Sequence, residues 1–229
     1  MSENSAPVSA APRIAVRHVQ LMRAILAAIA AVMITFSPDH AASYGLAVFS
    51  GFAITTALVF GFGAWMAYPA GRRWPIVLLA IVTVLAGMVS GIPVWRTTPV
   101  FFAIIMSWAA ITGIIELVTG WADRRAMVRD GILDPQRASE ARDAIVVGVM
   151  GVALALGVGL VAPDFRLDYF IDDAGQWFAL TGISIGVGVF GAYAAVVAVF
   201  LGIAAFSPRR TAPADAGADV ATSSSGESA

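Results

Sequence analysis

The chain of 229 residues contains no cysteine and no lysine, and only two of its residues are histidines. The lack of cysteine excludes disulfide bonds, thiolate metal sites and catalysis by a thiol. Charged residues make up 13% of the chain, against about 25% in soluble domains. The net charge of −1 gives no indication of nucleic-acid binding. We therefore expect no nucleic-acid partner, no metal and no cofactor.

Hydrophobic residues, in contrast, make up 59% of the chain, and most of them lie in six long apolar runs. A helix needs about 20 mostly apolar residues to cross the ~30 Å hydrocarbon core of a bilayer. The sequence therefore predicts an all-α integral membrane protein with six transmembrane helices in contact with lipid. The predicted spans cover residues 21–36, 44–68, 74–92, 100–121, 144–161 and 177–206.

The arginines predict the orientation of these spans. Arg96 and Arg166 are assigned to one side of the membrane, and the other twelve of the 14 arginines to the opposite side. Loops on the cytoplasmic side of a membrane carry the excess of basic residues. The arginine-rich side is therefore predicted to be cytoplasmic, together with both termini.

The segments outside the spans fall into two kinds. Residues 1–20 and 207–229 are rich in Ser, Ala and Pro and are predicted to be disordered cytoplasmic segments on either side of a transmembrane domain at 21–206. Residues 122–143 form a charged cytoplasmic loop, in which Gly131 is a helix stop and Asp134-Pro135 a helix start. The fourth helix is therefore expected to continue past Trp121, and the fifth to begin near Pro135.

The chain also contains a weak internal repeat. The spans form three successive helical hairpins, and the even spans carry a glycine at a similar depth, at Gly61, Gly120 and Gly202. Small residues also recur at four-residue spacing within several spans, which lets helix backbones approach closely in lipid. We interpret them as packing positions within the bundle, with contacts to a second copy or to another membrane protein as the alternative. The glycines concerned are Gly87, Gly91, Gly113, Gly182 and Gly186.

Residues 97–125, with the sequence TTPVFFAIIMSWAAITGIIELVTGWADRR, carry a family resemblance. The stretch resembles the two-helix repeat of HdeD-type acid-resistance membrane proteins, in which an outer proline precedes a helix with Gly-Ile and a second glycine, followed by inner arginines. The resemblance implies a protein of the bacterial cytoplasmic membrane that acts in acid or envelope stress. It implies no chemistry that can be assigned to individual residues.

Two ionisable residues fall inside the predicted spans. Charged groups are costly within a membrane, so each is a candidate functional residue. A helical rise of about 1.5 Å per residue puts Arg23 and Glu116 at comparable depth in the cytoplasmic half of the membrane. We expect the two to form an ion pair, or Glu116 to pair with Arg72 or Arg73. The alternatives are that both side chains reach the inner surface separately, or that Glu116 is a proton or ion site.

The rest of the spans offers little for catalysis. Residues 182–186 match the G-x-S-x-G pattern of serine hydrolases, but a serine nucleophile needs a nearby base. The two histidines, His18 and His40, fall outside the spans, so Ser184 is not expected to be catalytic. We therefore predict that the protein is not an enzyme.

The predicted outer face carries an acidic group of residues. Clustered carboxylates hold protons at a higher pH than isolated ones, so this face would lose negative charge as the exterior acidifies. A pH-responsive switch is one interpretation, and ordinary solvated loops are the other. The residues are Asp39, His40, Asp164, Asp168, Asp172 and Asp173.

Three functions remain open at this point. The first is a non-enzymatic membrane protein of the HdeD type in acid or envelope stress. The second is a small channel or transporter for an uncharged or weakly polar solute, which a continuous polar cavity reaching the membrane midplane would favour. The third is an accessory or scaffold subunit of a membrane complex, which a tightly packed bundle with an exposed groove of small residues would favour.

Overall fold

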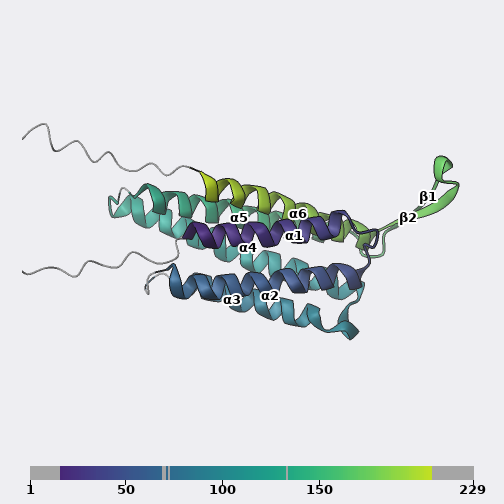
Figure 1. Ribbon diagram of the computed structural model, residues 1–229, viewed down its shortest axis with the longest axis horizontal. Coiled ribbons are helices and arrows are strands. Elements are labelled where there is room, and N and C mark those ends of the chain that lie inside the picture. Colours follow the sequence, from purple (N-terminus) through teal and green to yellow (C-terminus); the bar gives the residue numbers. More distant parts are fainter. Residues whose placement is uncertain (1–15, 69–70, 72, 133, 208–229) are drawn as a thin grey trace, which may run out of the picture.

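The computed structural model describes residues 16–68, 71, 73–132 and 134–207. Six long helices lie side by side in one bundle (Figure 1). All six are long and apolar enough to cross a membrane, which confirms the predicted all-α, six-span architecture. The helices are α1 (Val16–Thr35), α2 (Ala42–Met66), α3 (Trp74–Gly91), α4 (Thr98–Arg129), α5 (Pro135–Gly159) and α6 (Gly182–Phe206).

The outside of the bundle is apolar along its length. Large side chains such as Ile29, Leu58, Leu85, Ile114 and Val199 are more than half exposed. Contiguous exposed apolar surface of this kind is costly in water, whereas lipid tails solvate it. The chain is therefore a multi-pass membrane protein. The start of α1 and the end of α6 lie at the same end of the bundle (Figure 1). We call this the arginine-rich end.

The helices associate as three closely packed pairs. The most extensive contacts join α4 to α5, α1 to α6 and α2 to α3. The two helices of each predicted hairpin, α1–α2, α3–α4 and α5–α6, have less extensive contacts. The closest packing therefore joins helices that belong to different predicted hairpins. Glycine allows the close approach of α4 to α5, because a β-carbon on Gly148 of α5 would lie 2.6 Å from the Leu117 backbone nitrogen of α4.

The start of α1 differs from the prediction, whereas the helix ends in the charged loop agree with it. Helix α1 begins at Val16, so residues 16–20 are helical and not part of a disordered segment. In the charged loop, α4 continues to Arg129, Gly131 adopts φ +65°, and the Asp134 side chain accepts hydrogen bonds from the first turn of α5, as predicted. The rest of the two predicted tails, residues 1–15 and 208–229, lies outside the described residues.

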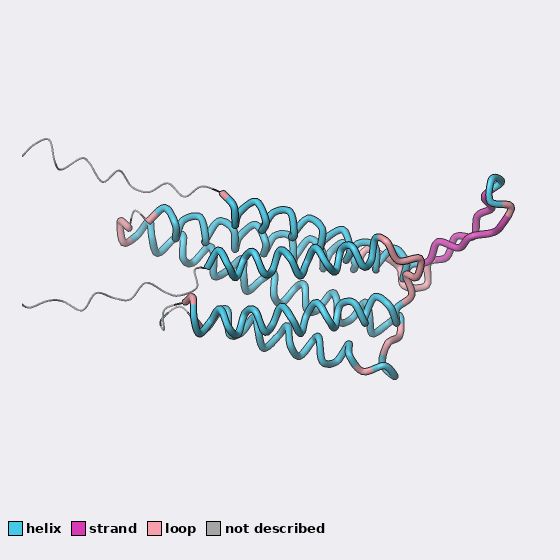
Figure 2. Tube along the Cα trace, in the orientation of Figure 1, coloured by secondary structure: helices cyan, strands magenta, loops and turns pink. Residues whose placement is uncertain are grey.

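The sixth span begins later than predicted. Residues 177–181, assigned to that span, belong to strand β2 (Gln176–Thr181), which pairs antiparallel with β1 (Arg166–Ile171). The two strands project from the end opposite the arginine-rich end (Figure 2). Their aromatic and β-branched side chains favour strands, and Gly175, at φ +63°, closes the turn.

The core of the bundle is aromatic in the half nearer the hairpin. Phe49 of α2 makes edge-to-face contacts with Trp108 of α4 and Phe190 of α6, with ring centroids 5.1 and 5.5 Å apart. Phe101 of α4 and Ile34 of α1 are also fully buried nearer that end. Rings from three helices therefore fill this half of the bundle.

Candidate functional site

The structure brings Arg23 of α1 and Glu116 of α4 together. Arg23 Nη2 donates to Glu116 Oε1 over 2.6 Å, and only 6% of Glu116 is exposed. The Arg23 guanidinium also lies 4.7 Å from the centre of the Phe60 ring. Arg73, an alternative partner, donates instead to the Tyr68 backbone carbonyl, while Arg72 lies outside the described residues.

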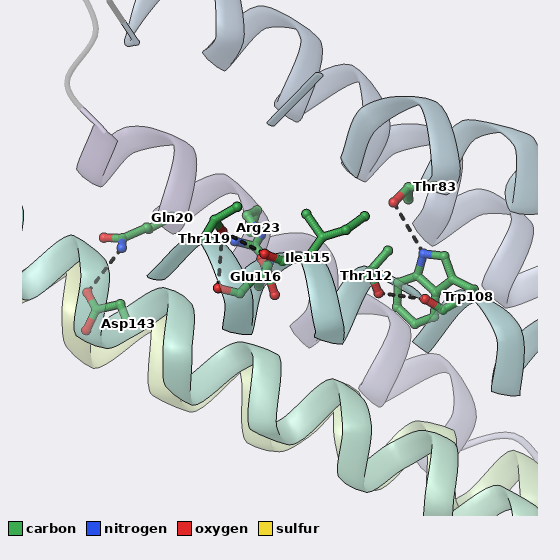
Figure 3. A network of polar contacts seen from close by, with 9 residues as sticks. All are labelled: Gln20, Arg23, Thr83, Trp108, Thr112, Ile115, Glu116, Thr119 and Asp143. Atoms are coloured by element: carbon green, nitrogen blue, oxygen red, sulfur yellow. Dashed lines mark hydrogen bonds and ion pairs between the residues drawn. The ribbon is translucent and has the colours of Figure 1, made fainter. Parts of the chain in front are cut away.

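A second buried carboxylate lies next to this pair. Gln20 Nε2 donates to Asp143 Oδ2 over 3.1 Å, and Asp143 is 4% exposed. Gln20 and Arg23 are three positions apart on α1 and so lie on one face of that helix. Figure 3 shows both contacts along α1. Asp143 was not predicted as a site residue, because it falls in the charged segment assigned to the cytoplasmic loop.

A cavity of about 240 Å³ occupies the arginine-rich half of the bundle. Its outermost lining residues include Gly71 and Ala122, which are exposed, and its innermost include Arg23 and Glu116. Each of the six helices contributes to its wall. Representative lining residues are Gln20, Phe60, Leu79, Thr119, Asp143 and Leu201.

Beyond the ion pair lies a hollow of about 20 Å³, whose mainly apolar wall also contains several polar side chains. Arg23 and Glu116 border both spaces, so the pair stands at their junction. Within the lining of the hollow, Trp108 Nε1 donates to Thr83 Oγ1 over 3.2 Å. Thr56 Oγ1 is buried and has no hydrogen-bond partner in the described part of the chain. This lining, to which Thr112 and Tyr193 also belong, reaches into the middle of the bundle.

The polar side chains of this lining were not predicted from the sequence to lie together. Hydroxyl groups in helices commonly bond to the backbone of their own helix, which holds for Thr112, whose Oγ1 donates to the Trp108 carbonyl over 2.7 Å. It does not hold for Thr83, which is fully buried and bonds across to α4. The only signals for this contact in the sequence are Thr83 and Trp108 near the middle of their spans. They are not sufficient, because the sequence does not show which helices face each other.

The glycines singled out from the sequence fall into different environments. A β-carbon on Gly113 would lie 2.8 Å from the Val152 backbone nitrogen, and one on Gly87 would lie 2.9 Å from Ile54. Gly91 and Gly186 are less restricted, with nearest contacts of 3.2 and 3.1 Å to the side chains of Ser50 and Phe101, respectively. The close backbone approaches of α4 to α5 also involve Gly120 and Gly148, which were not among the predicted packing positions.

Gly182 differs from the other predicted packing glycines. Its nearest neighbours are the carbonyl oxygens of Ala162 and Pro163, in the turn after α5, and not another helix. The helix-packing interpretation is wrong at this position. Two residues further on, Ser184 shares a hydrogen bond with Thr181, whose Oγ1 also accepts from the Ser184 backbone nitrogen at the start of α6. The Ser184 contacts therefore cap a helix.

The outer acidic residues are spread over separate loops. Asp39 lies in the α1–α2 turn, where its Oδ1 accepts a hydrogen bond from the Ala41 backbone nitrogen, and His40 is its neighbour. Asp168 pairs with Arg166 on the exposed strand β1, with Arg166 Nη2 and Asp168 Oδ1 3.0 Å apart. The remaining three lie in the α5–β1 turn and at the tip of the hairpin: Asp164, Asp172 and Asp173. These contacts are local, and a switch based on these acids stays a prediction.

Comparison of the chain with models of known protein families, with curated proteins and with solved structures finds no match. The resemblance to HdeD-type proteins, and a role in acid or envelope stress, therefore stay predictions. The same holds for an accessory or scaffold role. The geometry of the cavity and the buried ion pair is what bears on function.

Proposed function

We propose that the protein is a transporter for a small polar solute in the bacterial cytoplasmic membrane. The arginine-rich end faces the cytoplasm, in agreement with the distribution of basic residues. The solute enters the cavity from the cytoplasm and passes the Arg23–Glu116 pair to reach the smaller hollow. The single observation that carries this proposal is the cavity of about 240 Å³ that ends at this buried pair.

The cost of burying charge supports a role for the pair beyond structure. Replacing a buried ion pair by apolar residues of similar size is often neutral or stabilising, so stability alone gives little reason to keep it. Ionisable groups inside a membrane mark the paths of solutes and ions in many membrane proteins. The polar groups beyond the pair, including Thr56, Thr83 and Tyr193, continue such a path.

The helix pairing supports movement at this point. Arg23 lies on α1, which packs mainly on α6, whereas Glu116 lies on α4, which packs mainly on α5. The ion pair thus joins two closely packed helix pairs whose contacts with each other are sparser. When these pairs shift relative to each other, Arg23 and Glu116 separate and the passage opens, as in the rocking of packed units in other transporters.

The size of the cavity limits the solute. Pockets for drug-sized ligands measure roughly 300–1,000 Å³, and this cavity is smaller, at about 240 Å³. The aromatic packing around Phe49, Phe190 and Trp108 fills the other half of the bundle. The described conformation is therefore one in which a compact solute has access from the cytoplasmic side.

Flux into liposomes containing the purified protein tests this proposal. We expect at least one of glycerol, urea, alanine, ethylammonium and propionate to enter faster than into protein-free liposomes, measured by light scattering. Thr119→Trp places a large ring in the cavity wall and should slow this flux about tenfold or more. Val118→Trp is the matched control, because Val118 is 53% exposed on the outside of the same helix turn. Background flux for all five solutes, or equal flux through both variants, would overturn the proposal.

A further inference from the structure

The lining of the cavity carries more negative than positive charge. Among its described lining residues, Arg23 is the one arginine. The lining has four carboxylates, those of Glu116, Asp123, Glu140 and Asp143. Outside the cavity wall, Arg137 Nη2 lies 3.3 Å from Asp123, and Arg142 Nη2 lies 3.5 Å from Asp143 Oδ1. The Arg142 side chain is 69% exposed, so water screens its charge. The Arg137 side chain is only 23% exposed and offsets the charge of Asp123. A concave site with low-dielectric walls concentrates such a field and attracts cations.

Asp143 contributes a buried carboxylate oxygen that accepts no hydrogen bond from the described residues. Its side chain is 5% exposed, and this oxygen, Oδ1, forms an ion pair with Arg142, whose Nη2 lies 3.5 Å away. Buried polar atoms nearly always have a hydrogen-bond partner, and a buried carboxylate is costly without one. Asp143 also lines the cavity. A cation with an N–H donor that took the place of Arg142 would give this oxygen a hydrogen bond.

The two buried carboxylates lie in series along the cavity. Gln20 holds Asp143 and Arg23 holds Glu116, and a separation of three residues on α1 corresponds to about 4.5 Å along the helix axis. Asp143 is the one nearer the arginine-rich end, because Gln20 precedes Arg23. A cation that enters from this end meets Asp143 first and then competes with Arg23 for Glu116.

The remaining wall favours an organic cation over a metal ion. Val19, Phe60, Trp74, Ile76 and Leu79 present apolar and aromatic surface to the cavity. Aromatic faces attract organic cations, and Phe60 already lies 4.7 Å from the Arg23 guanidinium. Among the described residues, no group of three or more His, Cys, Asp or Glu could hold a metal ion.

From these observations we infer that the solute is a small organic cation, with an ammonium or guanidinium group bound by Asp143 and an apolar body against Phe60 and Leu79. The inference rests on the proposed transport function and specifies its substrate class. The Arg23–Glu116 pair is then the second step of the path, where the cation displaces the arginine from Glu116.

Binding of n-butylammonium to the purified full chain, measured by calorimetry, tests the inference. n-Butanol and butyrate serve as neutral and anionic probes of the same chain length. We expect n-butylammonium to bind more tightly than both, and Asp143→Asn to weaken its binding about tenfold or more, as for the loss of one charge-assisted hydrogen bond. Asp130→Asn is the matched control, because Asp130 is exposed and pairs with Arg129 at the end of α4. Sodium chloride should weaken n-butylammonium binding and leave n-butanol unaffected.

The outcomes separate the two proposals. If butanol or butyrate binds more tightly than butylammonium, and Thr119→Trp abolishes that binding, the solute site stands and the cation inference fails. Equal binding of butylammonium by wild type and Asp143→Asn also overturns the inference. If Asp143→Asn does not fold, the salt dependence of the wild-type protein decides, since salt-independent binding contradicts a charged site. Binding of none of the three probes overturns the cation inference, whereas flux of another solute through the liposomes would still support transport.

Discussion

The two halves of the bundle use the space between their helices in opposite ways. In the half next to the β-hairpin, rings of Phe49, Trp108 and Phe190 pack edge to face and fill the centre. In the arginine-rich half, the same six helices surround a cavity of about 240 Å³ lined with carboxylates. The packed half holds the helices together, and this allows the other half to leave polar groups and space for a ligand.

A second contrast lies across the bundle. Each closely packed pair buries a long contact, whereas the seams between pairs are sparser, and the Arg23–Glu116 pair bridges one of these seams. Stability and function thus depend on different contacts. Substitutions in the packed parts should affect folding, and substitutions in the cavity should affect solute binding and flux.

The largest effect is expected in the seam between α4 and α5. A β-carbon on Gly148 would lie 2.6 Å from the Leu117 backbone nitrogen and 2.7 Å from the Gly113 carbonyl oxygen, and backbone atoms cannot move aside. Gly148→Leu should therefore abolish the folded, monodisperse protein in size-exclusion chromatography. Gly188→Leu should leave the elution profile unchanged, because a β-carbon there would meet no atom of another described helix within 4 Å. A normal profile for Gly148→Leu would contradict the close packing of this pair.

Phenylalanine substitutions compare the two halves directly. Phe190→Ala leaves a void in the packed half and should lower the free energy of unfolding by about 3–5 kcal/mol. Phe60→Ala should cost about 1–2 kcal/mol, because Phe60 already borders the cavity and fewer contacts are lost. Unfolding in mixed micelles, followed by circular dichroism, measures both values. Equal losses would show that the two halves are packed alike.

The buried ion pair should give a smaller effect on stability. Glu116→Gln leaves the Arg23 charge without its counter-ion and should cost about 2–3 kcal/mol, toward the low end for buried pairs, because Arg23 is partly exposed to the cavity. The Arg23→Leu/Glu116→Leu double variant should regain most of the lost stability but should show no solute flux. Recovery of flux in the double variant would show that the pair is only structural.

The smallest effect is expected beyond the pair. Thr83→Val removes the acceptor of Trp108 Nε1 and should cost about 1 kcal/mol. Thr55→Val is the matched control, because the Thr55 hydroxyl is exposed and bonds to carbonyls of its own helix. The same unfolding measurement applies. A larger loss for Thr55→Val than for Thr83→Val would contradict the placement of Thr83 in a buried polar lining.

The six membrane helices could be predicted from the sequence, because the length and hydropathy of each apolar run decide whether a helix can span lipid. The sequence was also sufficient for Arg23 and Glu116, since the cost of charge in a membrane singles out such residues. The pairing of α1 with α6 could not be predicted, because many positions in each span are compatible with close packing. Without that pairing, the cavity could not be located.

Two further features were missed for local reasons. Asp143 lies in a segment rich in charges of both signs, so its burial against Gln20 depends on a contact between α1 and α5 that the sequence does not show. The strand Gln176–Thr181 merges with the apolar run of the sixth span, and hydropathy does not distinguish a strand from a helix there. Its pairing with Arg166–Ile171, across Gly175, is what separates it from α6.

Cysteine accessibility tests the central claim most directly, because the chain has no native cysteine. Single cysteines at Thr119 in the cavity wall and at Ser90, which is 1% exposed in the packed half, would be exposed in sealed vesicles to a membrane-impermeant thiol reagent. The account predicts that Thr119→Cys reacts only from the side of the arginine-rich end and that Ser90→Cys reacts from neither side. Protection of Thr119→Cys from this side, or its reaction from the opposite side, would contradict a water-filled cavity open at the arginine-rich end.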